Sequence, residues 1–166
     1  MTANPEDLKL IQRHIEDEVV CYRELIQVVE RERDILLSRD HSGLPEQAEQ
    51  KMGIARRLHE SRLARQEVMS RLSPDPASPL RLRDLAGLLP AAERGIFRAL
   101  LQRAQALAES LAAKNQANAR FVQEALDTVE QLMDILSGRD RSQTYDQEGR
   151  RNATSSGPPR LLTREV

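Results

Sequence analysis

The sequence predicts an all-α protein: an elongated antiparallel helical bundle or coiled coil with one long C-terminal helix and a disordered C-terminal tail. Charged residues make up 31% of the 166 residues, aromatic residues make up 2%, and tryptophan is absent. This composition suits long helices that meet along narrow seams better than a sheet sandwich. In addition, apolar residues recur at spacings of three and four over long stretches, and prolines and glycines interrupt them at few places.

The first predicted helix covers about residues 5–39. The stretch NPED supplies a capping side chain in Asn4, a proline suited to the first helical turn, and two acids at the positive end of the helix dipole. An apolar stripe follows until RDHSG breaks it. The stripe consists of Leu8, Ile11, Ile15, Val19, Tyr22, Ile26, Val29 and Leu36.

A second helix, of about residues 45–72, begins at Pro45 and carries a thinner apolar stripe. Because few residues separate it from the first helix, we expect the two to form an antiparallel hairpin. The stripe consists of Ala48, Met52, Ala55, Leu58, Met69 and Leu72.

The segment SPDPASP cannot continue a helix, because it holds three prolines in seven residues. After this connector we expect a short helix of about 80–87 and a long helix of about 90–137, which ends near Gly138. Residues 1–138 are predicted to form a single helical-bundle domain. Residues 139–166 are polar, rich in Gly, Pro and Ser and without periodicity, which predicts a disordered tail.

The long helix carries a seam in which only Asn115 and Asn118 interrupt apolar residues. Burying either amide without a partner would cost about 1 to 3 kcal/mol. Each asparagine therefore either meets a polar group across the seam and fixes its register, or marks a place where the seam opens toward a partner. The sequence leaves both alternatives open. The seam runs Phe97, Leu101, Ala104, Ala108, Leu111, Asn115, Asn118, Val122, Ala125, Val129, Leu132 and Leu136.

Composition and motifs argue against several classes of function. Cys21 is the single cysteine, so a disulfide framework and a cysteine-based zinc site are not expected, and no apolar stretch is long enough to cross a membrane. We therefore expect a cytoplasmic protein without membrane insertion. The net charge of −1 gives no field that would recruit nucleic acid. Without a catalytic or metal-binding motif, we expect no enzyme, no cofactor and no metal.

Three local features have a simple structural interpretation. His14 and Glu18 lie one helical turn apart and are expected to form a solvated ion pair rather than half of a metal site. Cys21 is expected to be a small, partly buried residue rather than a reactive thiol. A group of arginines on the second helix is interpreted as a solvated face rather than an RNA-binding surface. They are Arg56, Arg57, Arg62, Arg65 and Arg71.

Several stretches, in order, resemble a known family. The long helix contains KNQANARFVQEALDTVEQLMDILSG, and TYDQEG follows shortly after it. Upstream, VVERERDILLSRD is similar to the family's first helix, and LRLRDLAGLLPAAERGIFRALLQRAQAL to its leucine-rich turn before the long helix. Over most of residues 5–150 the chain resembles the FlgN family, the flagellar export chaperones for the hook-filament junction proteins. The second helix is richer in arginine than the family's glutamate-rich one.

The resemblance implies a cytoplasmic type III export chaperone. Such a protein binds the terminal helical segments of hook-filament junction proteins, prevents their premature assembly and delivers them to the export gate. The export ATPase is left open as a further partner, and so is self-association along the seam. The stretch TYDQEG is similar to a Tyr-Asp-x-x-Gly-like tail of the family, and this likeness implies that Tyr145 docks at the export gate. The client-binding residues are expected to be Asn115, Asn118, Val122, Val129, Leu132 and Leu136.

Two alternatives to the chaperone interpretation belong to other classes. A generic coiled-coil scaffold or adaptor without an export role would show the same helical periodicity. An RNA-binding helical hairpin would require binding to nucleic acid that weakens with salt.

Overall fold

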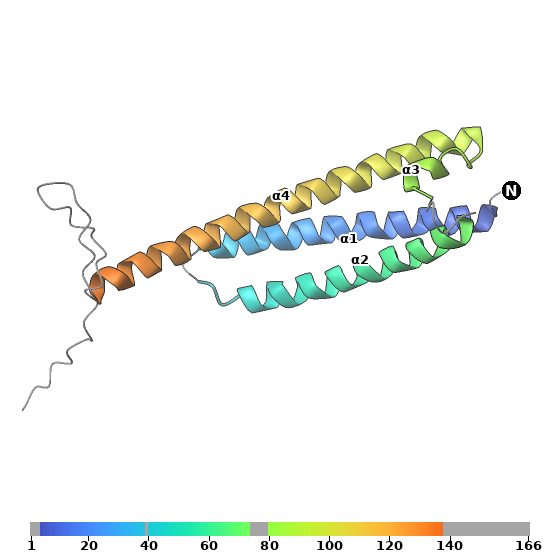
Figure 1. The fold of residues 1–166 in the computed structure, drawn as a ribbon. Helices are drawn as coiled ribbons and strands as arrows, with labels where there is room; N and C mark the ends of the chain where they lie inside the picture. The colour runs from blue at the N-terminus through green and yellow to red at the C-terminus, as the bar shows by residue number, and fades with distance from the viewer. Residues whose placement is uncertain (1–3, 39, 74–79, 138–166) are drawn as a thin grey trace, which may run out of the picture. The chain divides into compact units, whose positions relative to one another are not determined.

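The computed structural model describes residues 4–38, 40–73 and 80–137, and this part of the chain forms four α-helices and no strand (Figure 1). The helices are α1 (Pro5–Leu37), α2 (Leu44–Leu72), α3 (Leu82–Leu85) and α4 (Ala91–Leu136). The all-α fold class with one long C-terminal helix is confirmed. The predicted tail of 139–166 and most of the proline-rich connector lie outside the described residues.

The chain divides into two units, Met1–Glu124 and Ala125–Val166, and the boundary falls within α4. The first unit contains α1, α2, α3 and most of α4. The described part of the second unit is the rest of α4 and Ser137. That residues 1–138 act as a single domain stays a prediction.

The predicted cap of α1 is present. The Asn4 side-chain oxygen accepts a hydrogen bond from the backbone N–H of Glu6 at 3.1 Å, and Pro5 occupies the first turn. At the other end the Ser38 hydroxyl donates to the carbonyl of Ile35 at 2.8 Å. This local bond competes with continuation of the helix, and α1 ends at Leu37, two residues before the predicted end at 39.

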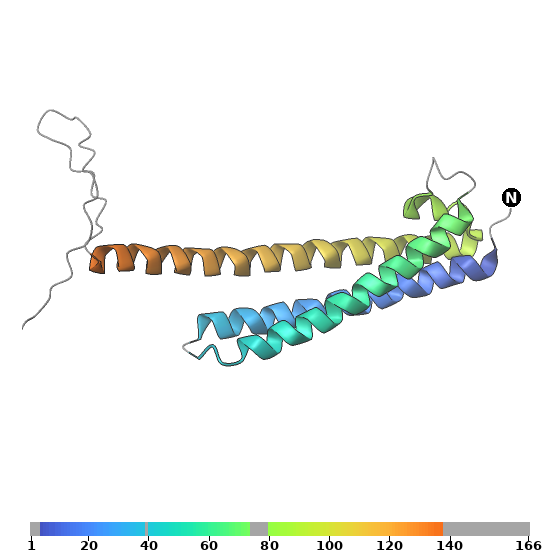
Figure 2. The ribbon, with the colours of Figure 1, turned by 60° about the horizontal axis from the view of Figure 1, so that its bottom comes forward.

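Helices α1 and α2 lie side by side in both ribbon views (Figures 1 and 2). Their ion pairs join Asp7 to Arg71 and Glu32 to Lys51, so residue numbers rise on one helix as they fall on the other. The predicted antiparallel hairpin is therefore confirmed.

The contact face of α2 differs from the predicted stripe. Met52 is 64% exposed, and Ala48 and Ala55 are exposed as well. The prediction was right at Leu58, which is buried, and at Met69 and Leu72, which pack against buried core residues. It was wrong at the other three positions because half of the contact face is polar, so apolar residues alone do not mark it. This face follows the four-three spacing of Gln47, Lys51, Ile54, Leu58, Ser61, Arg65, Val68 and Leu72, all buried or partly buried.

Two apolar clusters join α4 to the hairpin within the first unit. In the first, Ile11 and Ile15 of α1 meet Val68, Leu85 and Phe97. Full burial of one such side chain stabilises the fold by about 1.5 to 3 kcal/mol. In the second cluster, buried residues of α1 and α2 meet partly buried residues of α4. These are Cys21, Tyr22, Leu25 and Leu58, packed with Ile54, Leu107, Ala108 and Leu111.

Candidate functional site

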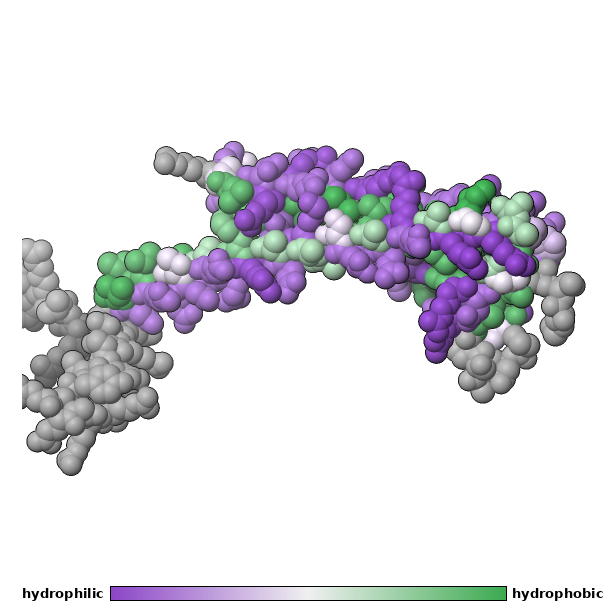
Figure 3. Space-filling model, turned by 90° about the horizontal axis from the view of Figure 1, so that it is seen from above, coloured by the Kyte–Doolittle hydropathy of each residue, from purple (hydrophilic) through white to green (hydrophobic). Residues whose placement is uncertain are grey.

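The C-terminal part of α4 exposes a run of large apolar side chains. Val129 is 56% exposed and Leu132 is 54% exposed, whereas Phe97, on the same seam near the start of the helix, is 2% exposed. In Figure 3 apolar residues line one side of these last turns, and hydrophilic residues line the other. We call this surface the C-terminal face. In the second unit it consists of Ala125, Leu126, Val129, Leu132, Met133 and Leu136.

The C-terminal face has the form of a helix-binding surface. Its positions recur at spacings of three and four and occupy an arc of about 120°, the width of the apolar stripe of an amphipathic helix. From Ala125 to Leu136 it extends about 16 Å at the usual rise of 1.5 Å per residue. Contiguous exposed apolar surface of this kind marks interaction sites. A second amphipathic helix, laid along the face, would cover it.

The predicted client-binding residues fall into two groups. Val122, Val129, Leu132 and Leu136 are exposed. Val122 belongs to the first unit and the other three to the second. The asparagines, in contrast, are buried or partly buried in the first unit. No observation tests client binding by any of the six, which stays a prediction.

Leu126 and Met133 belong to the C-terminal face but were not predicted. The single-file seam passes beside them. A packing helix usually has three or four apolar positions in every two turns. A stripe of that width would have included both residues.

Asn118 joins α4 to α1 through two hydrogen bonds. It is 6% exposed, and its Nδ2 atom donates to the Val29 carbonyl at 3.0 Å and to the Glu32 carboxylate at 3.2 Å. The same Glu32 oxygen accepts a hydrogen bond from Lys51 of α2 at 2.9 Å. One carboxylate thus connects three helices, and the Asn118 amide meets the polar groups of the hairpin.

The neighbours of Asn118 on α4 add weaker contacts with α1. Lys114 forms an ion pair with Glu30 at 2.9 Å. The Arg33 guanidinium lies 4.7 Å from the centre of the Phe121 ring, a cation–π contact. Asn115 is partly buried, and no polar partner for it is found in the described ranges.

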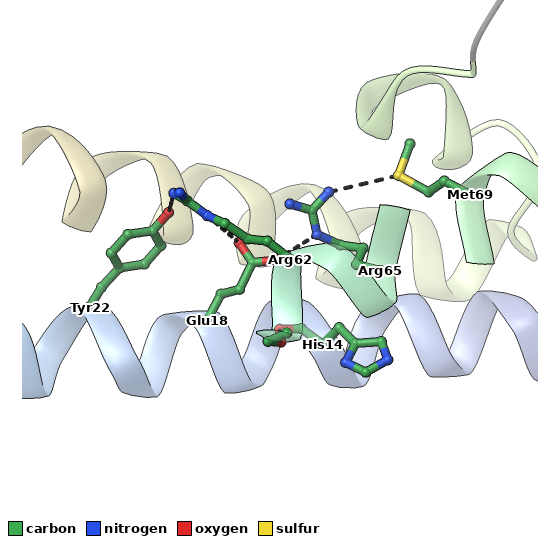
Figure 4. Close-up of polar contacts among 7 residues, drawn as sticks. His14, Glu18, Tyr22, Arg62, Arg65 and Met69 are labelled. Carbon is green, nitrogen blue, oxygen red and sulfur yellow. Dashed lines mark hydrogen bonds and ion pairs between the residues drawn. The ribbon is translucent and has the colours of Figure 1, made fainter. Parts of the chain in front are cut away.

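Glu18 is the centre of a polar cluster inside the hairpin (Figure 4). It is 5% exposed and accepts from Arg65 Nε at 2.6 Å, while Arg62 lies 3.7 Å away. Arg62 also donates to the Tyr22 hydroxyl oxygen. The prediction of a solvated ion pair between Glu18 and His14 was wrong, because two arginines of α2 reach the carboxylate across the hairpin.

The arginines of α2 are also not simply a solvated face. Arg65 is mostly buried, and Arg57 and Arg71 reach acids of α1, namely Glu24 and Asp7. The arginine-rich composition of α2 therefore complements an acidic α1 and holds the hairpin together.

Cys21 is a free, buried thiol, and burial raises its pKa, as the structural interpretation predicted. Tyr145 lies outside the described residues. Among the described residues no group of His, Cys, Asp and Glu could hold a metal ion, and no helix is both long and apolar enough to cross a membrane.

Comparison with known families decides the identity of the chain. The family model described as FlgN protein matches residues 7–153. The chain belongs to the FlgN family. The predicted resemblance is confirmed, and FlgN membership indicates a chaperone role in flagellar export. Neither the search of curated proteins nor that of solved structures gave a match.

Proposed function

We propose that this FlgN-family protein is a cytoplasmic export chaperone whose C-terminal face binds the terminal helical segments of hook-filament junction proteins. Binding would prevent their premature assembly until they are delivered to the export gate. One observation carries the proposal: five large apolar side chains between Leu126 and Leu136 remain exposed on one face of α4, whereas Phe97, at the start of the seam, is buried.

The size of the face indicates how binding works. The five large side chains of the face are about half exposed or more, so covering each one by a client contributes about 1 kcal/mol to binding, about 5 kcal/mol in all. Burial of the client's own apolar residues contributes about another 5 kcal/mol. The resulting sum of about 10 kcal/mol is comparable to the cost of association and of ordering a flexible segment. Because the margin is small, binding depends on the face as a whole and is sensitive to the loss of any two of its side chains.

The test is a double substitution, Val129→Asp with Leu132→Asp. Isothermal titration against the C-terminal segments of the two junction proteins, with circular dichroism of each mixture, is expected to show one-to-one binding and gained helix for the native chain. The double variant should keep its own helix content and bind at least tenfold more weakly, because two carboxylates would be buried against apolar residues.

A matched control keeps the added charge but moves it off the face. Gln131→Asp with Ile135→Asp changes two exposed residues of the same turns outside the C-terminal face. Gln131 lies almost opposite Val129, and Ile135 lies about 60° around the helix from Leu132. This variant should bind like the native chain. Equal binding by both double variants would refute the proposal. A loss of helix content in the first variant alone would show that Val129 and Leu132 are core residues instead.

Delivery is proposed to involve Tyr145, supported by the Tyr-Asp-x-x-Gly likeness. Tyr145→Ala should reduce secretion of the junction proteins while client binding stays normal. Unchanged secretion would exclude this role. The export gate, with the export ATPase left open, is the partner at this step.

The scaffold alternative makes a different prediction for the same face. A scaffold that self-associates through it would sediment as a concentration-dependent oligomer, and the Val129 and Leu132 double variant would become monomeric without any client. The chaperone proposal instead expects the client to compete with any such self-association.

A further inference from the structure

A second surface lies within the first unit, between α2 and α4. It is a cleft of about 620 Å³ with an apolar floor from α1 and α4. We call it the arginine groove. Its floor includes Ile15, Leu101, Ala104 and Ala108, and its rim includes Arg62, Arg65, Arg83 and Arg98.

The arginine groove carries an excess of positive charge. Its lining has one carboxylate, Glu18, and that group already binds Arg65 and Arg62. Arg83 pairs at the surface with its neighbour Asp84 at 3.8 Å. Arg98 is exposed and has no ion pair within the described ranges. Because arginine stays protonated, four guanidinium groups meet two carboxylates, Glu18 and the adjoining Asp84, which leaves a local excess of positive charge in a chain whose net charge is −1.

From this apolar floor and basic rim we infer that the arginine groove is a docking site for an acidic amphipathic helix of a partner protein. Such a helix would place an apolar stripe on the floor and carboxylates against the guanidinium groups of the rim. The lining on α4 runs from Arg98 to Ala108, which is about 15 Å or three helical turns. The site is separate from the C-terminal face and does not depend on its function.

An acidic helix fits the groove better than a single-stranded nucleic acid does. Binding of bases usually relies on aromatic rings on which they stack. Tyr22 is the aromatic residue of the lining, but it is 5% exposed and its ring lies against the Arg62 guanidinium, whose carbon is 5.5 Å from the ring centre. The aliphatic floor offers a base no comparable surface.

The experiment uses the full chain and two designed peptides of equal length. Both carry a leucine stripe at helical spacing, flanked by glutamate in one and by lysine in the other. Fluorescence anisotropy of labelled peptide measures the dissociation constant. The key variant is Arg98→Glu, and the matched control is Arg103→Glu, an exposed arginine of the same helix outside the groove.

The glutamate peptide is expected to bind at least fivefold more tightly than the lysine peptide. Arg98→Glu should weaken it about fivefold or more, because an attraction at the rim becomes a repulsion. Arg103→Glu should change little, and the Val129 and Leu132 double variant should still bind. Equal binding of the two peptides, equal effects of the two arginine variants, or displacement of the peptide by a short oligonucleotide at matching concentration would overturn the inference. So would loss of binding in the double variant alone.

Discussion

Replacing Asn118 with alanine tests whether the hydrogen bonds of this side chain hold α4 against the hairpin. The substitution removes both hydrogen bonds from the Nδ2 atom, to the Val29 carbonyl at 3.0 Å and to the Glu32 carboxylate at 3.2 Å. Lys51 keeps its own bond to Glu32. The carboxylate therefore stays paired, and no charge is left buried alone.

The expected loss of stability is about 2.5 kcal/mol. A neutral hydrogen bond contributes about 1 kcal/mol net and one to a charged group about 2 kcal/mol. Alanine returns about 0.5 kcal/mol through its higher helix propensity. Asn115→Ala is the natural control, because Asn115 lies one turn earlier and has no polar partner in the described part of the chain. It should gain the helix propensity and lose nothing.

Urea unfolding followed by far-UV circular dichroism measures both variants. The midpoint should fall for Asn118→Ala and stay level or rise slightly for Asn115→Ala. A double-mutant cycle of Asn118→Ala with Glu32→Ala should show a coupling energy above about 0.5 kcal/mol. If the two asparagine variants have the same urea midpoint, the hydrogen bonds of Asn118 do not stabilise the packing of α4 on the hairpin, and the prediction is wrong.

Two further predictions concern the hairpin. Glu18→Ala leaves Arg65 mostly buried without its carboxylate and should lower the free energy of unfolding by about 3 kcal/mol. Arg57→Ala, at the exposed pair with Glu24, should lower it by less than about 1 kcal/mol. Near-equal urea midpoints of the two variants would contradict this. Burial raises the pKa of the Cys21 thiol above its ordinary value of 9.0, so the folded state resists deprotonation and its stability should fall as pH rises through and beyond that value. Disulfide-exchange labelling of Cys21 near neutral pH should be slow in the native chain and rapid in urea. Rapid labelling of the native chain would contradict this prediction.

The course of α1 could be predicted from sequence, and most of α2's contact face could not. The stripe of α1 is apolar, and its strongest members, such as Ile11 and Ile15, are buried. On α2, Lys51, Ser61 and Arg65 occupy contact positions and find partners on α1. A residue-by-residue reading treats such side chains as solvated. Only pairing each one with an acid or a carbonyl across the hairpin would have identified the face.

The two asparagines show a similar limit. Their positions predicted that a buried amide in the seam would need a hydrogen-bond partner, but not which residue would supply it. The partners of Asn118 are a carbonyl and a carboxylate of α1, far away in sequence. A carbonyl leaves no trace in the identity of its residue, since every residue carries one. Register between distant helices therefore had to come from the structure.

Within the first unit, burial along the seam of α4 decreases before α1 ends. Asn118 is 6% exposed and bonds to Val29, whereas Val122, one turn further along α4, is 38% exposed. Helix α1 continues for about two turns beyond Val29, to Leu37. The apolar period of α4 is the same on both sides of Asn118, so the sequence pattern alone could not show where packing gives way to exposure.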